Sequence, residues 1–303
     1  MANRTLTFTT SQRGTHTLNA IDQIVVADTD IGFDADDAVA IAILARAPID
    51  TLLVATADET GGRRARLLRR LLDLTGRREV PVFTGLSCPG NPRRFVLDDE
   101  LTHPAPPSGP FLDELISILD QASGPILWIG LGPLTNLAWI LATRPALADR
   151  IRLVQMGGWL DRYRDRSRST HNFHTDPVAA GLVLRILHRP LLVLSDHADP
   201  SIQLGPDSPV AGFCRSATAP AWARLVGANL TEWHARRGYG SMMMDPLTVA
   251  TALQIPVATT AEERVRIGAD ARLTRDPAGR RIEVVTSVDY PKYLTWLDEA
   301  IIG

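Results

Sequence analysis

The sequence predicts an α/β fold built on an open, doubly wound and mainly parallel sheet. Short apolar runs rich in β-branched residues alternate with segments whose apolar residues recur at helical spacing. The runs are continuously apolar, as in strands that helices cover on both faces. The links between runs and helical segments are short, which is typical of strand–helix–strand units with right-handed crossovers.

Six strands of this sheet are expected along the first two thirds of the chain. They are 24–27, 51–56, 80–83, 126–130, 151–156 and 191–195. The helical spacing predicts intervening helices at 36–47, 61–75, 110–122, 134–148 and 177–188. From about 196 to 245 the pattern is helical and irregular. Two strands between about 264 and 288 flank a turn at 275–280, which predicts a C-terminal β-hairpin, and a last helix follows at about 290–301.

We expect a single domain over residues 1–303, because the sequence contains no internal repeat and no clear linker. Residues 1–22 form an N-terminal extension in this interpretation. Residues 86–109 are rich in Pro and Gly, and residues 157–171 are rich in Arg and Ser. Both segments are therefore expected to be long loops near the active site.

The overall composition excludes several classes of protein. The hydrophobic fraction is 45% and the charged fraction 22%, which are ordinary values for a soluble globular protein. A net charge of −2 argues against a generally basic nucleic-acid binder, and no apolar run reaches the roughly 20 residues that cross a bilayer. Neither nucleic acid nor a membrane is an expected partner, and without a signal region a cytoplasmic location is the default. Cys88 and Cys214 do not make a disulfide framework or a zinc site.

A dense group of carboxylates follows the first expected strand. It consists of Asp28, Asp30, Asp34, Asp36 and Asp37. Carboxylates this close together at the end of a buried strand repel one another, and a hard cation held by oxygen ligands would neutralise them. Helix capping accounts for one or two of these residues but not for Asp28 and Asp30 as well. An EF-hand loop fits poorly, because no glutamate follows the group before Glu59.

Polar segments also follow several of the other expected strands. They are 57–59, 130–136, 156–158 and 195–197. In an open α/β sheet, ligands bind beyond the carboxyl ends of the strands. We therefore expect these segments to share one site with the aspartate group.

Two classes of enzyme place AspXaaAsp after a first strand. One is the haloacid-dehalogenase-like phosphotransferases, in which the first aspartate, here Asp28, attacks phosphorus and Mg²⁺ joins the pair. Those enzymes need a later basic residue, usually a lysine, to hold the phosphoryl group. The only lysine here is Lys292, near the C-terminus, so an arginine would have to substitute.

Four motifs support the second class. AspThrAspIleGlyPheAspAlaAspAspAla (28–38) resembles the N-terminal signature of the inosine–uridine-preferring nucleoside hydrolase family. LeuGlyProLeuThrAsnLeuAla (131–138) resembles its second signature, and GlnMetGlyGly (155–158) with AsnPheHisThrAspProValAlaAla (172–180) resembles the third. MetMetAspProLeuThrValAla (243–250) resembles the fourth. The resemblance implies a nucleoside-hydrolase-like fold and an N-glycosidase that uses Ca²⁺ to hydrolyse a ribonucleoside or a related N-riboside.

The same resemblance implies roles for individual residues. Asp30 would be the general base, and Asp36 and Asn172 would hydrogen-bond the ribose hydroxyls. The metal ligands would be Asp30, Asp37, Asp245 and the main-chain carbonyl of Leu131. The implied reaction is attack by an Asp-activated, metal-bound water, through a transition state that resembles a ribosyl cation, with inversion at the anomeric carbon. A small-molecule nucleoside is the implied substrate, and a homodimer or homotetramer is the implied assembly.

The chain departs from the family pattern where the leaving base would receive a proton. Many members carry a histidine directly before the aspartate that corresponds to Asp245, whereas this chain has Met244, which has no proton to donate. The possible substitutes are His103, His234 and Tyr239. A base that leaves without help from an acid is another alternative.

The region expected around the ribose 5′ end also departs from the pattern. AspGluThr (58–60) stands where the family usually has GlyAsn, so Glu59 becomes a candidate substrate contact. Residues 162–168 are either a solvated loop or a lid in which Arg164 contacts an anionic group such as a 5′-phosphate. With these changes, a nucleoside- or sugar-binding protein without turnover is a further alternative.

Two groups of large side chains have no certain role in the expected site. Trp159 and Trp233 could stack on a base or belong to the core. A cluster of arginines is expected on a wet helix face, comprising Arg63, Arg64, Arg66, Arg69 and Arg70.

Overall fold

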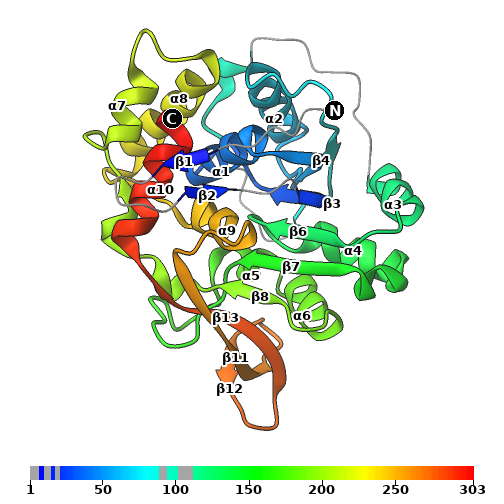
Figure 1. The fold of residues 1–303 in the computed structure, drawn as a ribbon. Helices are drawn as coiled ribbons and strands as arrows, with labels where there is room; N and C mark the ends of the chain where they lie inside the picture. Colours follow the sequence, from blue (N-terminus) through cyan, green and yellow to red (C-terminus); the bar gives the residue numbers. More distant parts are fainter. Residues whose placement is uncertain (1–6, 10–14, 18–20, 89–93, 102–111) are drawn as a thin grey trace.

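A parallel sheet forms the centre of the molecule in the computed structural model, which describes residues 7–9, 15–17, 21–88, 94–101 and 112–303. Its strands are β3 (Ile21–Thr29), β4 (Ile49–Thr56), β5 (Val82–Thr84), β6 (Ile126–Gly130), β7 (Ile151–Met156) and β8 (Leu191–Val193). They lie in the order β8-β7-β6-β3-β4-β5, and all neighbouring pairs are parallel (Figure 1). The chain changes direction across the sheet between β3 and β6, and such a switch point is where ligands bind in open α/β sheets.

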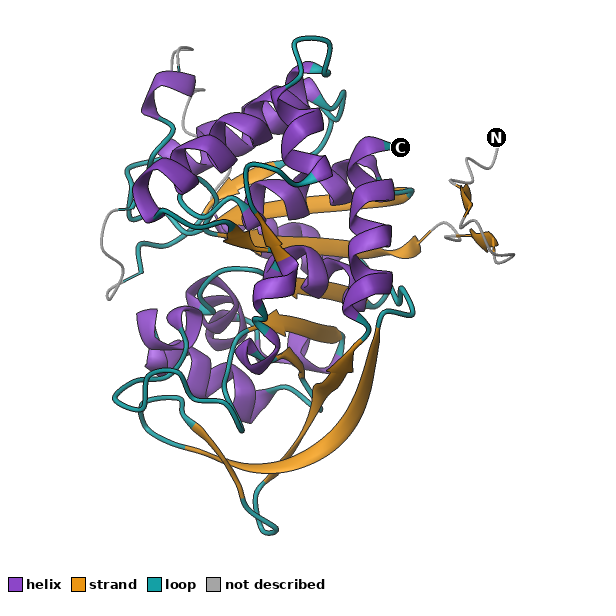
Figure 2. Cartoon of the chain, turned by 90° about the vertical axis from the view of Figure 1, so that its left-hand side faces the viewer, coloured by secondary structure: helices purple, strands orange, loops and turns teal. Residues whose placement is uncertain are grey.

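Antiparallel strands extend the sheet beyond β8. They are β11 (Ala258–Ile267), β12 (Leu273–Arg275) and β13 (Arg280–Val288), in the order β12-β11-β13, with β13 parallel to β8 (Figure 1). Figure 2 shows the long strands at the bottom of the view reaching beyond the helices. The two strands that flank the turn at 275–280 both pair with β11, which lies between them. The sequence did not predict this order. β13 pairs with β11 and not with β12 because β11, with 10 residues, matches the 9 residues of β13, whereas β12 has only 3.

Helices cover both faces of the sheet, as the predicted doubly wound class requires. One face carries α1 (Asp36–Arg46), α2 (Arg63–Leu74), α7 (Pro209–Arg215), α8 (Ala221–Arg237), α9 (Met244–Ala252) and α10 (Tyr290–Ile302). The other face carries α3 (Leu112–Gln121), α4 (Thr135–Thr143), α5 (His171–Thr175) and α6 (Pro177–Ile186). Successive side chains of a strand point to opposite faces, so Val25 packs in the first layer and Val26 in the second.

The predicted parallel strands and the helices between them agree with the structure to within three residues at each end, with one exception. The helix expected at 134–148 ends at Thr143, and a 3-10 helix covers Pro145–Asp149. Pro145 disfavours the helical conformation for the residue before it, and Arg144 accordingly has φ −135° and ψ 76°. The start expected for the third helix, at residue 110, lies outside the described residues.

Two short antiparallel pairs complete the described strands. β1 (Thr7–Thr9) pairs with β2 (Thr15–Thr17) inside the predicted N-terminal extension, and β9 (Gln203–Leu204) pairs with β10 (Ser241–Met242). Within the described residues, no helix is both long and apolar enough to span a bilayer.

Candidate functional site

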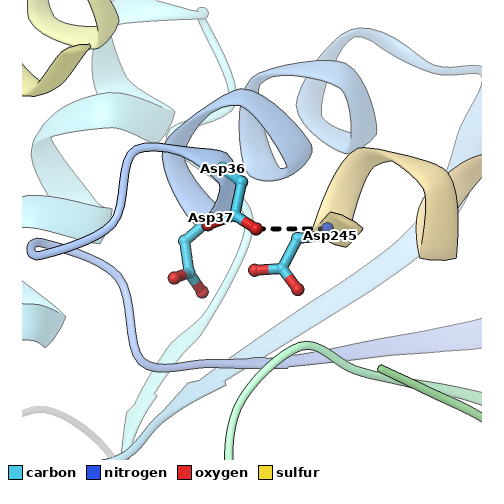
Figure 3. A group of neighbouring side chains, drawn as sticks. All are labelled: Asp36, Asp37 and Asp245. Carbon is cyan, nitrogen blue, oxygen red and sulfur yellow. Dashed lines mark hydrogen bonds between the residues drawn. The ribbon is translucent and has the colours of Figure 1, made fainter. Parts of the chain in front are cut away.

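Three buried carboxylates meet where the first turns of two helices approach each other. Asp36 and Asp37 begin α1, and Asp245 lies in the first turn of α9. One oxygen atom from each carboxylate lies within 4.8 Å of the other two, and Figure 3 shows the side chains around one shared space. The main-chain N–H of Asp245 donates to Oδ2 of Asp36 at 3.4 Å, which ties the two helices together. Both helix N-termini favour negative charge at this point.

The electrostatics of this group favour a bound cation. Burial raises the pKa values of Asp36, Asp37 and Asp245 well above their usual range, and the neighbouring carboxylates raise them further. Like charges removed from water are stable in the ionised form only beside a positive partner. The donor atoms are hard oxygens, which are the ligands of Ca²⁺ and Mg²⁺. The residues therefore fit a divalent cation.

Asp30 lines the same cavity, which has a volume of about 260 Å³. Its Oδ2 lies 3.6 Å from Nε2 of His171. Burial acts to raise the pKa of Asp30, but the neighbouring His171 and the charge of Arg64 outweigh it and hold this pKa below its usual value. Asp30 is therefore a carboxylate at neutral pH and can accept a proton from a molecule bound in the cavity.

A main-chain carbonyl and a side-chain amide also line the cavity. Leu131 follows β6, and its carbonyl accepts a hydrogen bond from Nδ2 of Asn172 at 2.6 Å. The same amide nitrogen lies 3.2 Å from the carbonyl of Met156. Asn172 is buried at the start of α5, so its position is fixed by the ends of β6 and β7.

The cavity thus brings together six residues that were predicted from the sequence to form the site. They are Asp30, Asp36, Asp37, Leu131, Asn172 and Asp245. They follow β3 and β6 or begin α1, α5 and α9, so they lie at the carboxyl edge of the sheet. Asp34 lies there too, where its carboxylate accepts hydrogen bonds from the Ser241 hydroxyl and the Ala35 N–H. Burial raises the pKa of Asp34 to about 6.

Glu59 is placed beneath the cavity and does not line it. It is buried in an ion pair with Arg64, whose guanidinium also donates to the carbonyl of Ile31 at 2.6 Å and to that of Asp30. The expectation that Arg64 lies on a wet helix face is wrong, since its side chain is only 1% exposed. The carbonyls of the segment after β3 need donors, and Arg64 supplies them from α2.

The other candidate contacts have different outcomes. Arg164 donates to the carbonyl of Ala198 and does not line the cavity. His103 lies outside the described residues. His234 does not line the cavity, and the hydroxyl of Tyr239 accepts a hydrogen bond from Arg237 at 2.7 Å.

The two tryptophans differ in position. Trp233 lines the cavity, whereas Trp159 is buried and its ring centre lies 5.4 Å from that of Tyr163.

Several side chains that line the cavity were not predicted from the sequence. They are Phe33, Arg94, Met156, Arg168, His171 and Arg237. A signal existed for His171, which directly precedes Asn172, and for Arg168, which ends the charged segment 162–168. Arg94 and Arg237 lie in a loop and at a helix end, where neither spacing nor a motif marks them.

Asp28 does not face the cavity. Its side chain is 3% exposed and accepts a hydrogen bond from Nδ2 of Asn136 at 2.8 Å, and burial raises its pKa to about 8. A phosphotransferase of the haloacid-dehalogenase type would need this carboxylate to attack the substrate. The position of Asp28 therefore does not support that alternative.

A second, larger cavity of about 480 Å³ lies beside β13. Arg162, Asp196 and Tyr290 are among its lining residues. In the described part of the chain, the carboxylates that line this second cavity do not lie close enough together to bind one cation between them. The smaller cavity at the carboxyl edge of the sheet is therefore the candidate active site.

Comparison with known proteins agrees with this choice. A family model described as inosine-uridine preferring nucleoside hydrolase matches residues 25–295. The pyrimidine-specific ribonucleoside hydrolase RihA of Escherichia coli O9:H4 (strain HS) is 26% identical over 302 residues, covering 89% of each chain. The protein of the same name from Photobacterium profundum is 28% identical over 178 residues, covering 53% of this chain and 56% of that protein.

Solved structures share the fold. A plant nucleoside hydrolase, PpNRh1, superimposes with a TM-score of 0.75 at 22% identity, covering 92% of this chain and 98% of that one. A purine-preferring ribonucleoside hydrolase from Gardnerella vaginalis gives a TM-score of 0.73 at 22% identity, with the same coverage of 92% and 98%. The family match spans most of the sequence, and the fold has its carboxylates at the expected edge of the sheet. The chain therefore belongs to the inosine-uridine preferring nucleoside hydrolase family and is an enzyme of the N-glycosidase class.

Proposed function

We propose that this enzyme cleaves the N-glycosidic bond of a ribonucleoside, or of a related N-riboside, in one displacement by water that depends on Ca²⁺. One observation carries the proposal. Asp30, Asp37, Asp245 and Leu131 line a single cavity, although they come from three separate parts of the chain.

Four residues would hold the cation in this proposal: Asp30, Asp37, Asp245 and, through its carbonyl, Leu131. A bound Ca²⁺ would fix the vicinal ribose hydroxyls and make water more acidic. Asp36 lies close enough to Asp37 and Asp245 to be a ligand as well. We assign Asp36 to the ribose hydroxyls, because one of its oxygens already accepts the Asp245 N–H and the other is left for a substrate hydroxyl.

Asn172 is the second residue that we assign to the ribose. Its amide nitrogen already donates to Leu131, and its carbonyl oxygen can accept a hydrogen bond from a hydroxyl. Binding of the sugar at two points orients the anomeric carbon toward the water.

Asp30 is the general base in this proposal. As water attacks the anomeric carbon, the glycosidic bond breaks, the base leaves with its electron pair, and Asp30 takes the proton from the water. The surrounding carboxylates stabilise the positive charge that develops on the ribose ring. A single displacement predicts inversion, so a β-riboside would give α-ribose first.

The leaving base needs a proton or stabilisation of its negative charge. Met244 is buried and has no proton to donate. Among the histidines in the described residues, His171 lines the cavity, and its contact with Asp30 suits support of the general base. We therefore assign His171 to Asp30 and not to the leaving group.

The named relatives differ in the base they act on, since one is called pyrimidine-specific and another purine-preferring. The test is therefore a panel of purine and pyrimidine nucleosides, assayed for reducing sugar with Ca²⁺ and with a chelator. We expect sugar release that the chelator abolishes and that added Ca²⁺ restores. Release of sugar at an undiminished rate by metal-free protein would contradict the proposal.

Two further measurements test its finer parts. NMR of the first sugar product separates inversion from retention, and early β-ribose would contradict a single displacement. We also propose a homodimer or homotetramer, as the family resemblance suggests, and light scattering after size exclusion measures the mass directly.

A further inference from the structure

The cavity that holds the carboxylates is also lined by cations. Arg94, Arg168 and Arg237 line it together with Arg64. Arg64 is buried against Glu59, whereas the other three residues are exposed to solvent. Their guanidinium groups are therefore accessible to a molecule that enters the cavity.

Two of these arginines stack on adjoining aromatic rings. The Cζ atom of Arg94 lies 5.5 Å from the ring centre of Phe33, and that of Arg237 lies 5.3 Å from the ring centre of Trp233. The rings of Phe33 and Trp233 meet edge to face, with their centres 5.4 Å apart. These four residues make up what we call the arginine–aromatic wall. Stacking holds the face of each guanidinium and leaves its N–H edge for an acceptor.

Neither arginine of the wall is neutralised by a carboxylate of the described residues. Arg237 donates to the neutral hydroxyl of Tyr239 through Nε at 3.1 Å and through Nη2 at 2.7 Å, so the Nη1 end of its guanidinium is the part left for an anion. Arg168 forms an ion pair with Asp165 at 3.0 Å, but both side chains are more than 40% exposed, so an anion can compete for Arg168. Two cations at the cavity that form no ion pair within the described residues favour the binding of an anion.

The wall does not serve to balance the acidic residues of the cavity. The side chains that lower the pKa of Asp30 are His171 and Arg64. No arginine of the wall forms an ion pair with Asp30, Asp34 or Asp36, all of which are described. The acidic and basic side chains of the cavity are therefore not paired with each other, and each set can bind a different part of one substrate.

We propose that the substrate is an anionic N-riboside, whose phosphate or carboxylate binds to Arg94 and Arg237. This inference rests on the proposed hydrolysis of an N-riboside. A guanidinium forms paired, charge-assisted hydrogen bonds with either anion, whereas the acceptor atoms of a neutral nucleoside carry no net charge and bind it less strongly. The anion is either a 5′-phosphate on the ribose or a carboxylate on the base, and the rings of Phe33 and Trp233 offer a surface for the base.

The test compares neutral and anionic substrates in matched sets. One set is uridine, uridine 5′-monophosphate and orotidine, and the other is inosine and inosine 5′-monophosphate. The variants are Arg94→Gln and Arg237→Gln. Arg236→Gln is the control, because Arg236 adjoins Arg237, is exposed, pairs with Glu232 at 3.5 Å and does not line the cavity.

In the wild type we expect kcat/KM for one anionic substrate to exceed that of its neutral partner at least tenfold. Each wall variant should lower this ratio by about tenfold, because it loses a charge-assisted contact. Preference for the monophosphates assigns the anion to the ribose, and preference for orotidine assigns it to the base. Arg236→Gln should leave the ratio unchanged.

Equal or better cleavage of the neutral nucleosides by the wild type would overturn the inference. A ratio of anionic to neutral kcat/KM that neither Arg94→Gln nor Arg237→Gln alters would overturn it as well.

Calorimetric binding of the same compounds to the Asp30→Asn protein separates this failure from failure of the hydrolase proposal. If the wild type cleaves none of the compounds, yet an anion binds tightly and Arg237→Gln weakens it, the hydrolase proposal fails and the anion site stands. If nucleosides are cleaved and no anionic compound binds more tightly than its neutral partner, the anion site fails and the hydrolase proposal stands.

Discussion

The imidazole Nε2 of His171 lies 3.6 Å from the carboxylate Oδ2 of Asp30. The next residue, Asn172, contacts the carbonyl of Leu131, so one short helix, α5, reaches both the proposed general base and a proposed metal ligand. A histidine beside a base can hold its carboxylate in place and keep it ionised.

The substitution His171→Ala should therefore lower kcat by about tenfold to a hundredfold. His171 is one of the groups that lower the pKa of Asp30, so its loss should also move the acid limb of the kcat/KM profile to higher pH. His174→Ala is the matched control, since His174 lies on the exposed side of α5 and does not line the cavity. An unchanged acid limb and an unchanged kcat in His171→Ala would remove the assignment.

The carboxylates should divide between metal and sugar. Asp37→Asn and Asp245→Asn should each weaken Ca²⁺ binding by more than about a hundredfold, since even outer-shell partners of a metal contribute up to that factor. Asp36→Asn should keep most of the Ca²⁺ affinity and raise KM. Calorimetric titration with Ca²⁺ and steady-state kinetics measure the two effects. Loss of Ca²⁺ binding in Asp36→Asn as large as in Asp37→Asn would identify Asp36 as a ligand.

Metal-free protein should become less stable as the pH rises. The pKa values of Asp36, Asp37 and Asp245 are raised in the native state, whereas the unfolded chain loses these protons near pH 4. The native state then binds more protons than the unfolded state, so the free energy of unfolding falls from about pH 4 toward pH 8.

Bound Ca²⁺ favours the ionised carboxylates and should oppose this loss. Thermal melting between pH 5 and pH 8, with chelator and with Ca²⁺, measures the effect. The difference in Tm between the two conditions should grow as the pH rises. A Tm in chelator that stays constant or increases over this range would contradict the raised pKa values.

The buried pair of Arg64 and Glu59 should behave differently from an exposed ion pair. Removing one partner in Arg64→Met leaves an uncompensated buried charge and should cost about 3–5 kcal/mol of unfolding free energy. The double variant Arg64→Met with Glu59→Leu should recover part of this loss. Arg63→Met, which breaks the exposed pair with Asp98, should cost less than about 1 kcal/mol. Urea unfolding measures all three, and equal losses for Arg64→Met and Arg63→Met would contradict the buried role.

Much of the fold could be predicted from the sequence because its signals are local. The apolar runs and helical spacings gave the parallel strands and the helices between them to within a few residues, and Pro145 accounts for the one helix that ends early. The pairing of β11 with both β12 and β13 could not be predicted, because strand order depends on contacts between segments far apart in the chain.

The candidate site divides in the same way. The sequence by itself determined the family, the density of aspartates after β3 and the six residues that the cavity brings together, because these lie in contiguous motifs. Only the tertiary structure decided that Arg64 is buried beneath Asp30, that His171 faces Asp30, and that Arg94 and Arg237 stack on neighbouring rings. The physical reason is that these contacts join loops and helix ends that no local spacing relates, so long-range packing of the chain fixes their positions.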